Sequence, residues 1–157
     1  MVHIRLLRLI QSEANNLRYV MNKENITQEN FGGRMNFLRR EHSTTLQAWS
    51  DANMTYGSTL SSADRLGFRC GACYEYPAFD PCSSMPLQLR IRPLIVMECS
   101  VIGGAYLGLG CTDGAREEIL KLKATCRKVN GRFGLLWHNS YLKSPQLKRL
   151  YKSVLEG

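Results

Sequence analysis

The sequence of 157 residues lacks any hydrophobic run approaching the roughly 20 residues that a membrane-spanning helix needs. A transmembrane helix is therefore not expected. The first ten residues are basic and apolar, but arginines interrupt them and polar residues follow, which is a poor match to a secretory signal peptide. Internal repeats and low-complexity segments are also missing. The length suits one globular domain, which we expect to cover residues 1–157.

Several motifs of enzymes and nucleotide-binding proteins are absent as well. The sequence has no nucleophile elbow, no phosphate-binding glycine loop and no dinucleotide-binding fingerprint. The pairs Gly103-Gly104 and Gly108-Leu109-Gly110 follow a predicted strand, but no helix opens at the spacing that such fingerprints require. We interpret both as turns.

The six cysteines do not form a complete zinc motif. Cys70-Gly-Ala-Cys73 has the spacing of a zinc knuckle, and Cys82 and Cys99 are candidates for further ligands. A structural zinc site normally needs a second pair of ligands at characteristic spacing, and that pair is missing. A chain of this size without an export signal does not need disulfides for stability, so we expect reduced thiols and a cytoplasmic protein.

The net charge is +8, from 21 Lys and Arg against 13 Asp and Glu. Such a charge favours acidic partners, nucleic acid among them. The basic residues are nevertheless scattered over positions expected on the solvated sides of helices, so we do not expect nucleic-acid binding. A small zinc- or nucleic-acid-binding module built on Cys70 and Cys73 remains an alternative.

Hydrophobic patterns in the second half predict strands over 93–99 and 133–138. A helix capped by Asp113 lies between them, and Ser144-Pro145 opens a last helix. Strands alternating with helices across short connections are typical of an α/β fold with a parallel sheet.

The first half of the chain is more mixed. The chain opens on a helical pattern with no strand before it, which predicts that the first strands of the sheet are missing. Further expected features are a helix over 6–21, a short strand over 34–39, a helix capped by Ser43, and an irregular connection over 55–85 with a short strand at 68–70.

Two predicted strands end in residues capable of acid-base chemistry. His138 follows the apolar run 133–137, and Glu98 follows the apolar run 93–97. Because the carboxyl ends of parallel strands meet at one edge of a sheet, we expect the carboxylate beside the imidazole, oriented for proton transfer. The alternatives are a histidine that only ends a core strand and a Glu98 that meets water or Arg92.

Arg34 and Arg69 stand in glycine-rich surroundings. An arginine so placed can hold a carboxylate by a bidentate pair. Both residues are equally consistent with a surface position.

Three stretches together resemble the polysaccharide deacetylase family, in its bacterial branch associated with surface-polysaccharide genes. They are residues 33–39, residues 56–77 with the run Gly67-Phe-Arg-Cys-Gly71, and residues 135–139 with Leu136-Trp137-His138. The strand over 93–98 lies where the family has one. The resemblance implies a distorted (β/α) barrel, of which this chain is the carboxyl-terminal portion with its first strands missing.

The resemblance also implies a function. The family removes N-acetyl or O-acetyl groups from sugars with a divalent metal, zinc foremost, and is classed as a hydrolase of non-peptide carbon–nitrogen bonds. Position by position, His138 stands at the general acid, Glu98 near the acidic residue that orients it, and Leu136 at the acetyl pocket. Arg34 or Arg69 stands where arginines steady the catalytic aspartate.

Trp137 and Tyr76, within the same stretches, are the further candidates for binding an acetylated glycan. His3 is the candidate remnant of the metal-binding histidines, but no second histidine follows it at helix-turn spacing. The paired aspartates of the family are also missing, and Asn36 and Gly57 stand where the branch has histidine and aspartate. We therefore expect a truncated protein, inactive alone and able to self-associate through an uncovered sheet edge, or a non-catalytic interaction protein.

Overall fold

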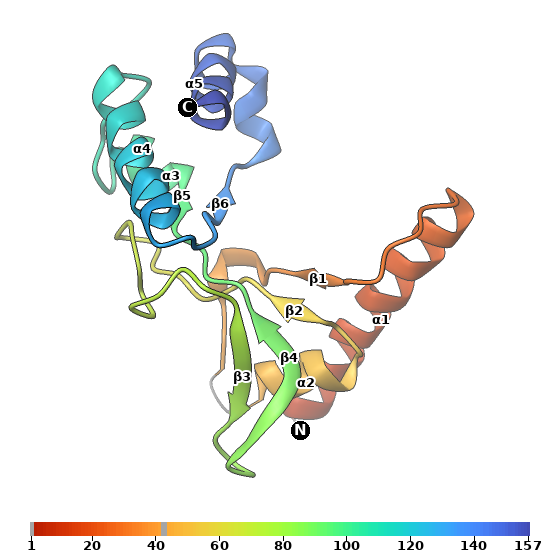
Figure 1. Cartoon of the computed structure of the whole chain (residues 1–157). Helices are drawn as coiled ribbons and strands as arrows, with labels where there is room; N and C mark the ends of the chain where they lie inside the picture. Colours follow the sequence, from red (N-terminus) through yellow and green to blue (C-terminus); the bar gives the residue numbers. More distant parts are fainter. Residues whose placement is uncertain (1, 42–43) are drawn as a thin grey trace. The chain divides into compact units, whose positions relative to one another are not determined.

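A computed structural model describes residues 2–41 and 44–157, and the side chains of residues 2–6 lie outside the described part. The chain is a mixed α/β protein, and three of the four strand pairings in the described residues are parallel. The fold divides into two compact units (Figure 1). The first comprises Met1–Thr59 and Glu75–Arg92, and the second comprises Leu60–Tyr74 and Pro93–Gly157.

The first unit contains a four-stranded sheet of order β1-β2-β4-β3. The pairs β1/β2 and β2/β4 are parallel, whereas β3 and β4 form an antiparallel hairpin. In chain order its elements are α1 (Val2–Lys23), β1 (Gly32–Gly33), the 3₁₀ turn η1 (Asn36–Leu38), α2 (Thr45–Asp51), β2 (Tyr56–Gly57), β3 (Tyr76–Asp80) and β4 (Met85–Ile91).

The predicted amino-terminal helix is confirmed as α1. Its stripe of Ile10, Ala14 and Met21 is buried, and the helix packs against α2. Nothing in α1 or the other helices of the described ranges is long and apolar enough to cross a membrane. The predicted cap of α2, Ser43, lies outside the described residues.

Two strand predictions in the first half are wrong. Residues 34–39 form the turn η1, in which Phe37 has a left-handed backbone with φ of 55°, and the strand is Gly32–Gly33 instead. Residues 68–70 lie in a turn closed by a bond of 2.9 Å from the Gly71 amide to the Phe68 carbonyl. The glycines of β1 carry no apolar pattern, so hydrophobic periodicity could not reveal that strand.

The hairpin β3–β4 was not predicted. β3 lies within the connection 55–85 that was expected to be irregular, and β4 begins at its last residue and continues to Ile91. Residues 87–91 of β4 alternate apolar and polar, and Leu89 and Ile91 are buried. At the connecting turn the Asp80 carboxylate accepts bonds of 3.0 Å from the amides of Cys82 and Ser83. The Ser83 hydroxyl and these amides lower the pKa of Asp80.

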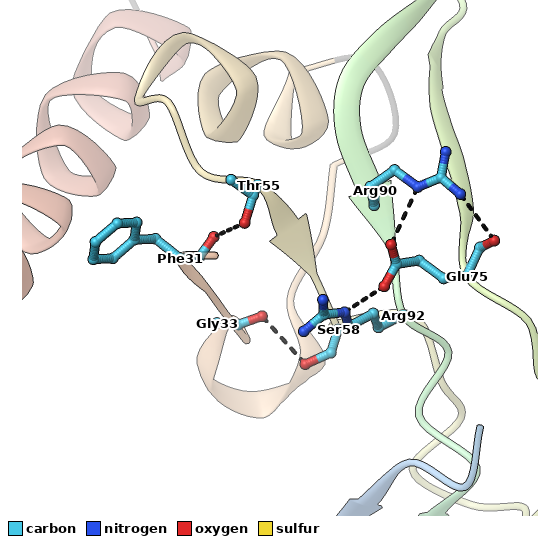
Figure 2. A network of polar contacts seen from close by, with 7 residues as sticks. All are labelled: Phe31, Gly33, Thr55, Ser58, Glu75, Arg90 and Arg92. Carbon is cyan, nitrogen blue, oxygen red and sulfur yellow. Dashed lines mark hydrogen bonds and ion pairs between the residues drawn. The ribbon is translucent and has the colours of Figure 1, made fainter. Parts of the chain in front are cut away.

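One ion-pair network ties the start of β3 to the end of β4 (Figure 2). The Glu75 carboxylate lies between two arginines, with Oε1 3.2 Å from Nε of Arg90 and Oε2 2.5 Å from Nε of Arg92. The Arg92 guanidinium also stacks 3.6 Å above the ring of Tyr56 in β2. Arg92 therefore has Glu75 as its carboxylate partner.

Removing the charge of Glu75 is expected to destabilise the first unit. Glu75→Gln keeps the shape of the side chain but removes both ion pairs, so we expect the free energy of unfolding to fall by about 1–2 kcal/mol at low salt. The loss should shrink at high salt, because ions screen half-exposed pairs. Urea unfolding at two salt concentrations measures both effects. The control, Glu118→Gln, breaks the exposed pair with Lys121 and should change nothing measurable.

The second unit joins a short parallel sheet to helices around one apolar cluster. Its elements are β5 (Val96–Met97), α3 (Glu98–Ile102), α4 (Asp113–Lys128), β6 (Leu135–Leu136), the 3₁₀ turn η2 (Asn139–Lys143) and α5 (Pro145–Glu156). The cluster, which we call the core cluster, comprises Cys73, Ile95, Val96, Val101, Ala115, Ile119, Cys126, Leu150 and Val154.

The helix predictions hold well in this unit. The Ser144 hydroxyl caps α5 with Pro145 in its first turn, as expected. The predicted cap of α4, Asp113, is wrong. The cap is Thr112, whose hydroxyl accepts from the Ala115 amide, and Asp113 is the acidic residue of the first turn. The predicted strands over 93–99 and 133–138 are both shorter than expected: β5 spans Val96–Met97, because α3 begins at Glu98, and β6 spans Leu135–Leu136.

Candidate functional site

The ends of β5 and β6 form the candidate site. These strands pair in parallel, with Val96 opposite Leu135 and Met97 opposite Leu136. Glu98 directly follows β5, and His138 comes two residues after β6. The His138 amide donates to Glu98 Oε1 over 3.0 Å, and Nδ1 of the imidazole contacts the same oxygen. The structure thus places the Glu98 carboxylate beside the His138 imidazole, as the sequence analysis predicted.

The two partners differ sharply in exposure. The Glu98 side chain is fully buried, whereas 48% of the His138 side chain is exposed. An ionised carboxylate only accepts hydrogen bonds, so with Glu98 in that form the proton is assigned to Nδ1, which donates to Oε1. The second ring nitrogen, Nε2, is then the one available for exchanging a proton with another molecule.

The two carboxylate oxygens of Glu98 differ in their contacts. Oε2 is buried and accepts no hydrogen bond from the described residues. An unsatisfied buried acceptor costs about 1–3 kcal/mol, and more when it is charged. Buried polar atoms without a partner are rare in proteins, so this one makes Glu98 a candidate for a chemical role.

The neighbouring thiol responds to Glu98. Burial, and then the negative charge of Glu98, raise the pKa of Cys99 above its ordinary value. Cys99 is therefore a probe of the charge on a carboxylate that solvent does not reach.

Successive side chains along β6 and the two residues after it alternate between the core cluster and the candidate site. Leu135 and Trp137 pack against the core cluster, and the Trp137 ring lies 5.2 Å from that of Tyr151. Leu136 and His138 project to the opposite side, because successive side chains of an extended strand alternate. Leu136 therefore shares a face with the imidazole, whereas Trp137 contributes to the packing of helix α5.

Tyr141 is a neighbour of the imidazole that the sequence analysis missed. Its ring lies 6.1 Å from that of His138, edge to face. The turn η2 brings it there through a bond of 3.1 Å from the Tyr141 amide to the His138 carbonyl. The spacing of three residues would have identified it had a 3₁₀ turn been predicted after the strand.

Arg69 binds main chain rather than a carboxylate. Its guanidinium donates to the carbonyl of the buried Ser61. The turn containing Arg69 follows Gly67, whose φ of 106° favours glycine. The Gly67 amide donates over 2.9 Å to the carbonyl of Ile95, the residue before β5.

The remaining candidates belong to the first unit. Nε of Arg34 donates to the Ser58 carbonyl over 2.9 Å. Tyr76 opens β3, half-buried and opposite Ile91 of β4. His3 lies in the first turn of α1, with its side chain outside the described part.

The cysteine pair of the zinc alternative divides between two environments. Cys73 is buried in the core cluster, whereas Cys70 is half-buried. Within residues 2–41 and 44–157, the described side chains include no group of three or more His, Cys, Asp or Glu that could hold a metal ion. The described residues therefore do not fit a zinc site.

No protein-family profile, curated protein or solved structure matches this chain.

Gly134 permits the close approach of the two strands. Its carbonyl accepts from the amides of Ile95 and Val96 over 2.9 and 3.0 Å. A Cβ at this position would lie inside contact distance of the Pro93 carbonyl, which is main chain and cannot turn aside.

We therefore expect Gly134→Ala to separate β6 from β5 and to lower the free energy of unfolding by about 1–3 kcal/mol, through steric strain. Chemical denaturation measures the change. The control is Gly104→Ala, because a Cβ on Gly104 meets no atom within 4 Å. It should shift stability by less than about 0.5 kcal/mol. Equal effects of the two substitutions would contradict the steric explanation.

Neutralising Glu98 is expected to make Cys99 more reactive. Glu98→Gln removes the negative charge that helps to raise the pKa of Cys99, so that pKa should fall and the thiolate fraction at pH 8 should rise. Iodoacetamide labelling followed by mass spectrometry gives the rate at each cysteine. The exposed Cys111 is the internal control and should label equally in both proteins. An unchanged rate at Cys99 would show that Glu98 carries no charge in the folded protein.

Proposed function

We propose that this chain is the carboxyl-terminal portion of a polysaccharide-deacetylase-like barrel and that it acts in removing acetyl groups from a carbohydrate, with His138 as general acid. The observation that carries the proposal is the half-exposed imidazole held by the buried carboxylate of Glu98. That arrangement lies at the carboxyl ends of parallel strands, where α/β proteins place their chemistry.

The proposed reaction is hydrolysis of an acetamide or acetate ester on a sugar. Water adds its oxygen to the acetyl carbon and loses its protons to base in the solvent, the bond from that carbon to the sugar nitrogen or oxygen breaks, and the acetyl group is released as acetate. The departing atom takes a proton from Nε2 of the imidazolium, which the solvent then protonates again. Glu98 holds Nδ1–H throughout and is the counterion of the imidazolium. A well-placed general acid contributes about 10² to 10⁴ in rate.

Neighbouring residues support this assignment to different degrees. Leu136 shares the face of His138 and suits contact with an acetyl methyl group. Tyr141 limits the motion of the ring from its edge. Arg69, in the same unit, is proposed as a supporting residue, and its guanidinium already holds the Ser61 carbonyl. Arg34 belongs to the first unit, holds the Ser58 carbonyl, and is a candidate through the family resemblance alone.

The divalent metal, zinc foremost, belongs to this proposal through the family resemblance alone. The described residues do not form its ligand set, so no step is assigned to it here. His3 remains the candidate ligand from this chain. Trp137 and Tyr76 remain candidates for contact with the glycan. Trp137 packs against α5, so only the part of its ring that α5 does not cover is available for that contact.

Substitution of His138 tests the proposal directly. Acetate release is measured from N-acetylated and O-acetylated oligosaccharides, with zinc and other divalent ions added. Because a truncated protein is expected to be inactive alone, the assay uses both this chain and a longer protein that supplies the missing strands. Where acetate is released, we expect His138→Ala to lower the rate by about 10² to 10⁴, because the leaving group loses its proton donor. The matched control is Ser140→Ala, an exposed position two residues away, which should stay within about threefold of the unmodified protein.

Two outcomes would contradict the assignment. Equal rates for His138→Ala and the unmodified protein would remove His138 from the reaction. No acetate release with any ion, together with retained binding of the acetylated oligosaccharide, would favour the non-catalytic interaction protein.

A further inference from the structure

The second unit contains a pair of buried thiols that the proposed function does not use. Cys73 is 3% exposed and Cys126 is 1% exposed, and both belong to the core cluster. Cys73 lies in the segment that precedes β3, and Cys126 lies in the last turns of α4. These residues are far apart in sequence, so tertiary structure alone brings them together.

Two consecutive residues after α4 hold the main chain of both cysteines. The Gly131 amide donates to the Cys126 carbonyl and the Arg132 amide donates to the Cys73 carbonyl, each over 2.8 Å. The Tyr74 hydroxyl adds a third tie, to the carbonyl of Val129. The backbones at the two cysteines are therefore fixed relative to each other by hydrogen bonds on both sides.

Gly131 also positions the sulfur of Cys73. A Cβ on Gly131 would overlap Sγ of Cys73, so that sulfur packs directly on the main chain that leaves Cys126. Cys73 also lies near enough to the Cys126 thiol to raise the pKa of that thiol. Two neighbouring buried thiols on backbones that are tied together are placed to form a disulfide, in which the S–S distance is about 2.05 Å.

We propose that Cys73 and Cys126 form a disulfide when the chain meets a peroxide, and that the bond locks residues 60–74 to the carboxyl end of α4. This proposal does not rest on the deacetylase assignment. A metal is not the better explanation, since among the described residues the pair has no third His, Cys, Asp or Glu to complete a ligand group.

The chemistry balances with hydrogen peroxide as the oxidant. The Cys73 thiolate attacks one peroxide oxygen, the O–O bond breaks, and Cys73 becomes a sulfenic acid as water leaves. The Cys126 sulfur then attacks the Cys73 sulfur, forming the S–S bond and releasing a second water. Two electrons pass from the two thiols to the peroxide. Burial and the neighbouring Cys73 raise the pKa of Cys126 to about 11, which suits Cys126 to the second step rather than to the first.

Peptide mapping of the full chain tests the proposal. Exposed thiols, Cys82 and Cys111 among them, are first blocked under native conditions with N-ethylmaleimide. The chain is then treated with hydrogen peroxide, unfolded in iodoacetamide without reductant, and digested with trypsin. We expect the tryptic peptide 124–127 joined to the peptide 70–90, with fragmentation placing the bond at Cys73.

Variants assign the bond, because the peptide 70–90 also contains Cys70. Cys70→Ser should keep the cross-link, whereas Cys73→Ser and Cys126→Ser should abolish it. The oxidised chain should melt about 5–10 °C above the reduced chain, since the bond restricts the unfolded state. Cys126→Ser should show no such difference.

If a serine variant fails to fold, peptide mapping of the unmodified protein still tests the proposal. Recovery of Cys126 as an alkylated free thiol, or joined to any cysteine other than Cys73, would overturn the proposal. So would an oxidised chain that melts no higher than the reduced one.

Discussion

Parallel pairing of β5 with β6 is the constraint on which the candidate site depends. Glu98 and His138 are separated by 40 residues, and they meet because two amides of 95–96 converge on the carbonyl of Gly134. A slip of one residue would turn Leu135 and Trp137 away from the core cluster. Burial of those two side chains therefore fixes the position of His138 on the other face. In this way the hydrophobic effect on one side of a short strand determines the geometry of a polar contact on the other.

Among the charged contacts of the described residues, those of Glu75 and of Glu98 follow different physical rules. In the first unit, Glu75 has two guanidinium partners and each member of the network keeps part of its surface in water, so charge neutralisation is easy and the network stabilises a hairpin. In the second unit, Glu98 is fully buried, its charged partner is the half-exposed imidazole of His138, and its Oε2 accepts no hydrogen bond from the part of the chain that the structure describes. Burial of a carboxylate on those terms opposes folding. The first arrangement suits a structural role, and the second suits chemistry at the exposed ring.

The second unit also shows how one short segment can serve several elements. Residues 129–134 follow α4, tie its end to Cys73 and Tyr74, and then supply the Gly134 carbonyl that receives β5. The same six residues thus position the buried thiols and the strand that ends at His138. Glycine is required at both positions. The sulfur of Cys73 occupies the space that a Cβ would take at Gly131, and the Pro93 carbonyl occupies it at Gly134. The packing of the thiols and the geometry of the imidazole are linked through this segment.

The sequence by itself determined the features that depend on near neighbours in the chain. Helical stripes identified α1, α4 and α5, the Ser144-Pro145 cap located the start of α5, and apolar runs ending in polar residues brought Glu98 and His138 to notice. These signals are local, because a helix bonds each residue to one four positions away. Tertiary structure alone decided the pairing of Gly32–Gly33 with β2, the partners of Arg34 and Arg69, the contact of Cys73 with Cys126, and the loss of a predicted strand at 68–70. Strand pairing and buried contacts join residues far apart in the chain, and the energy that selects them comes from packing that no short stretch of sequence contains.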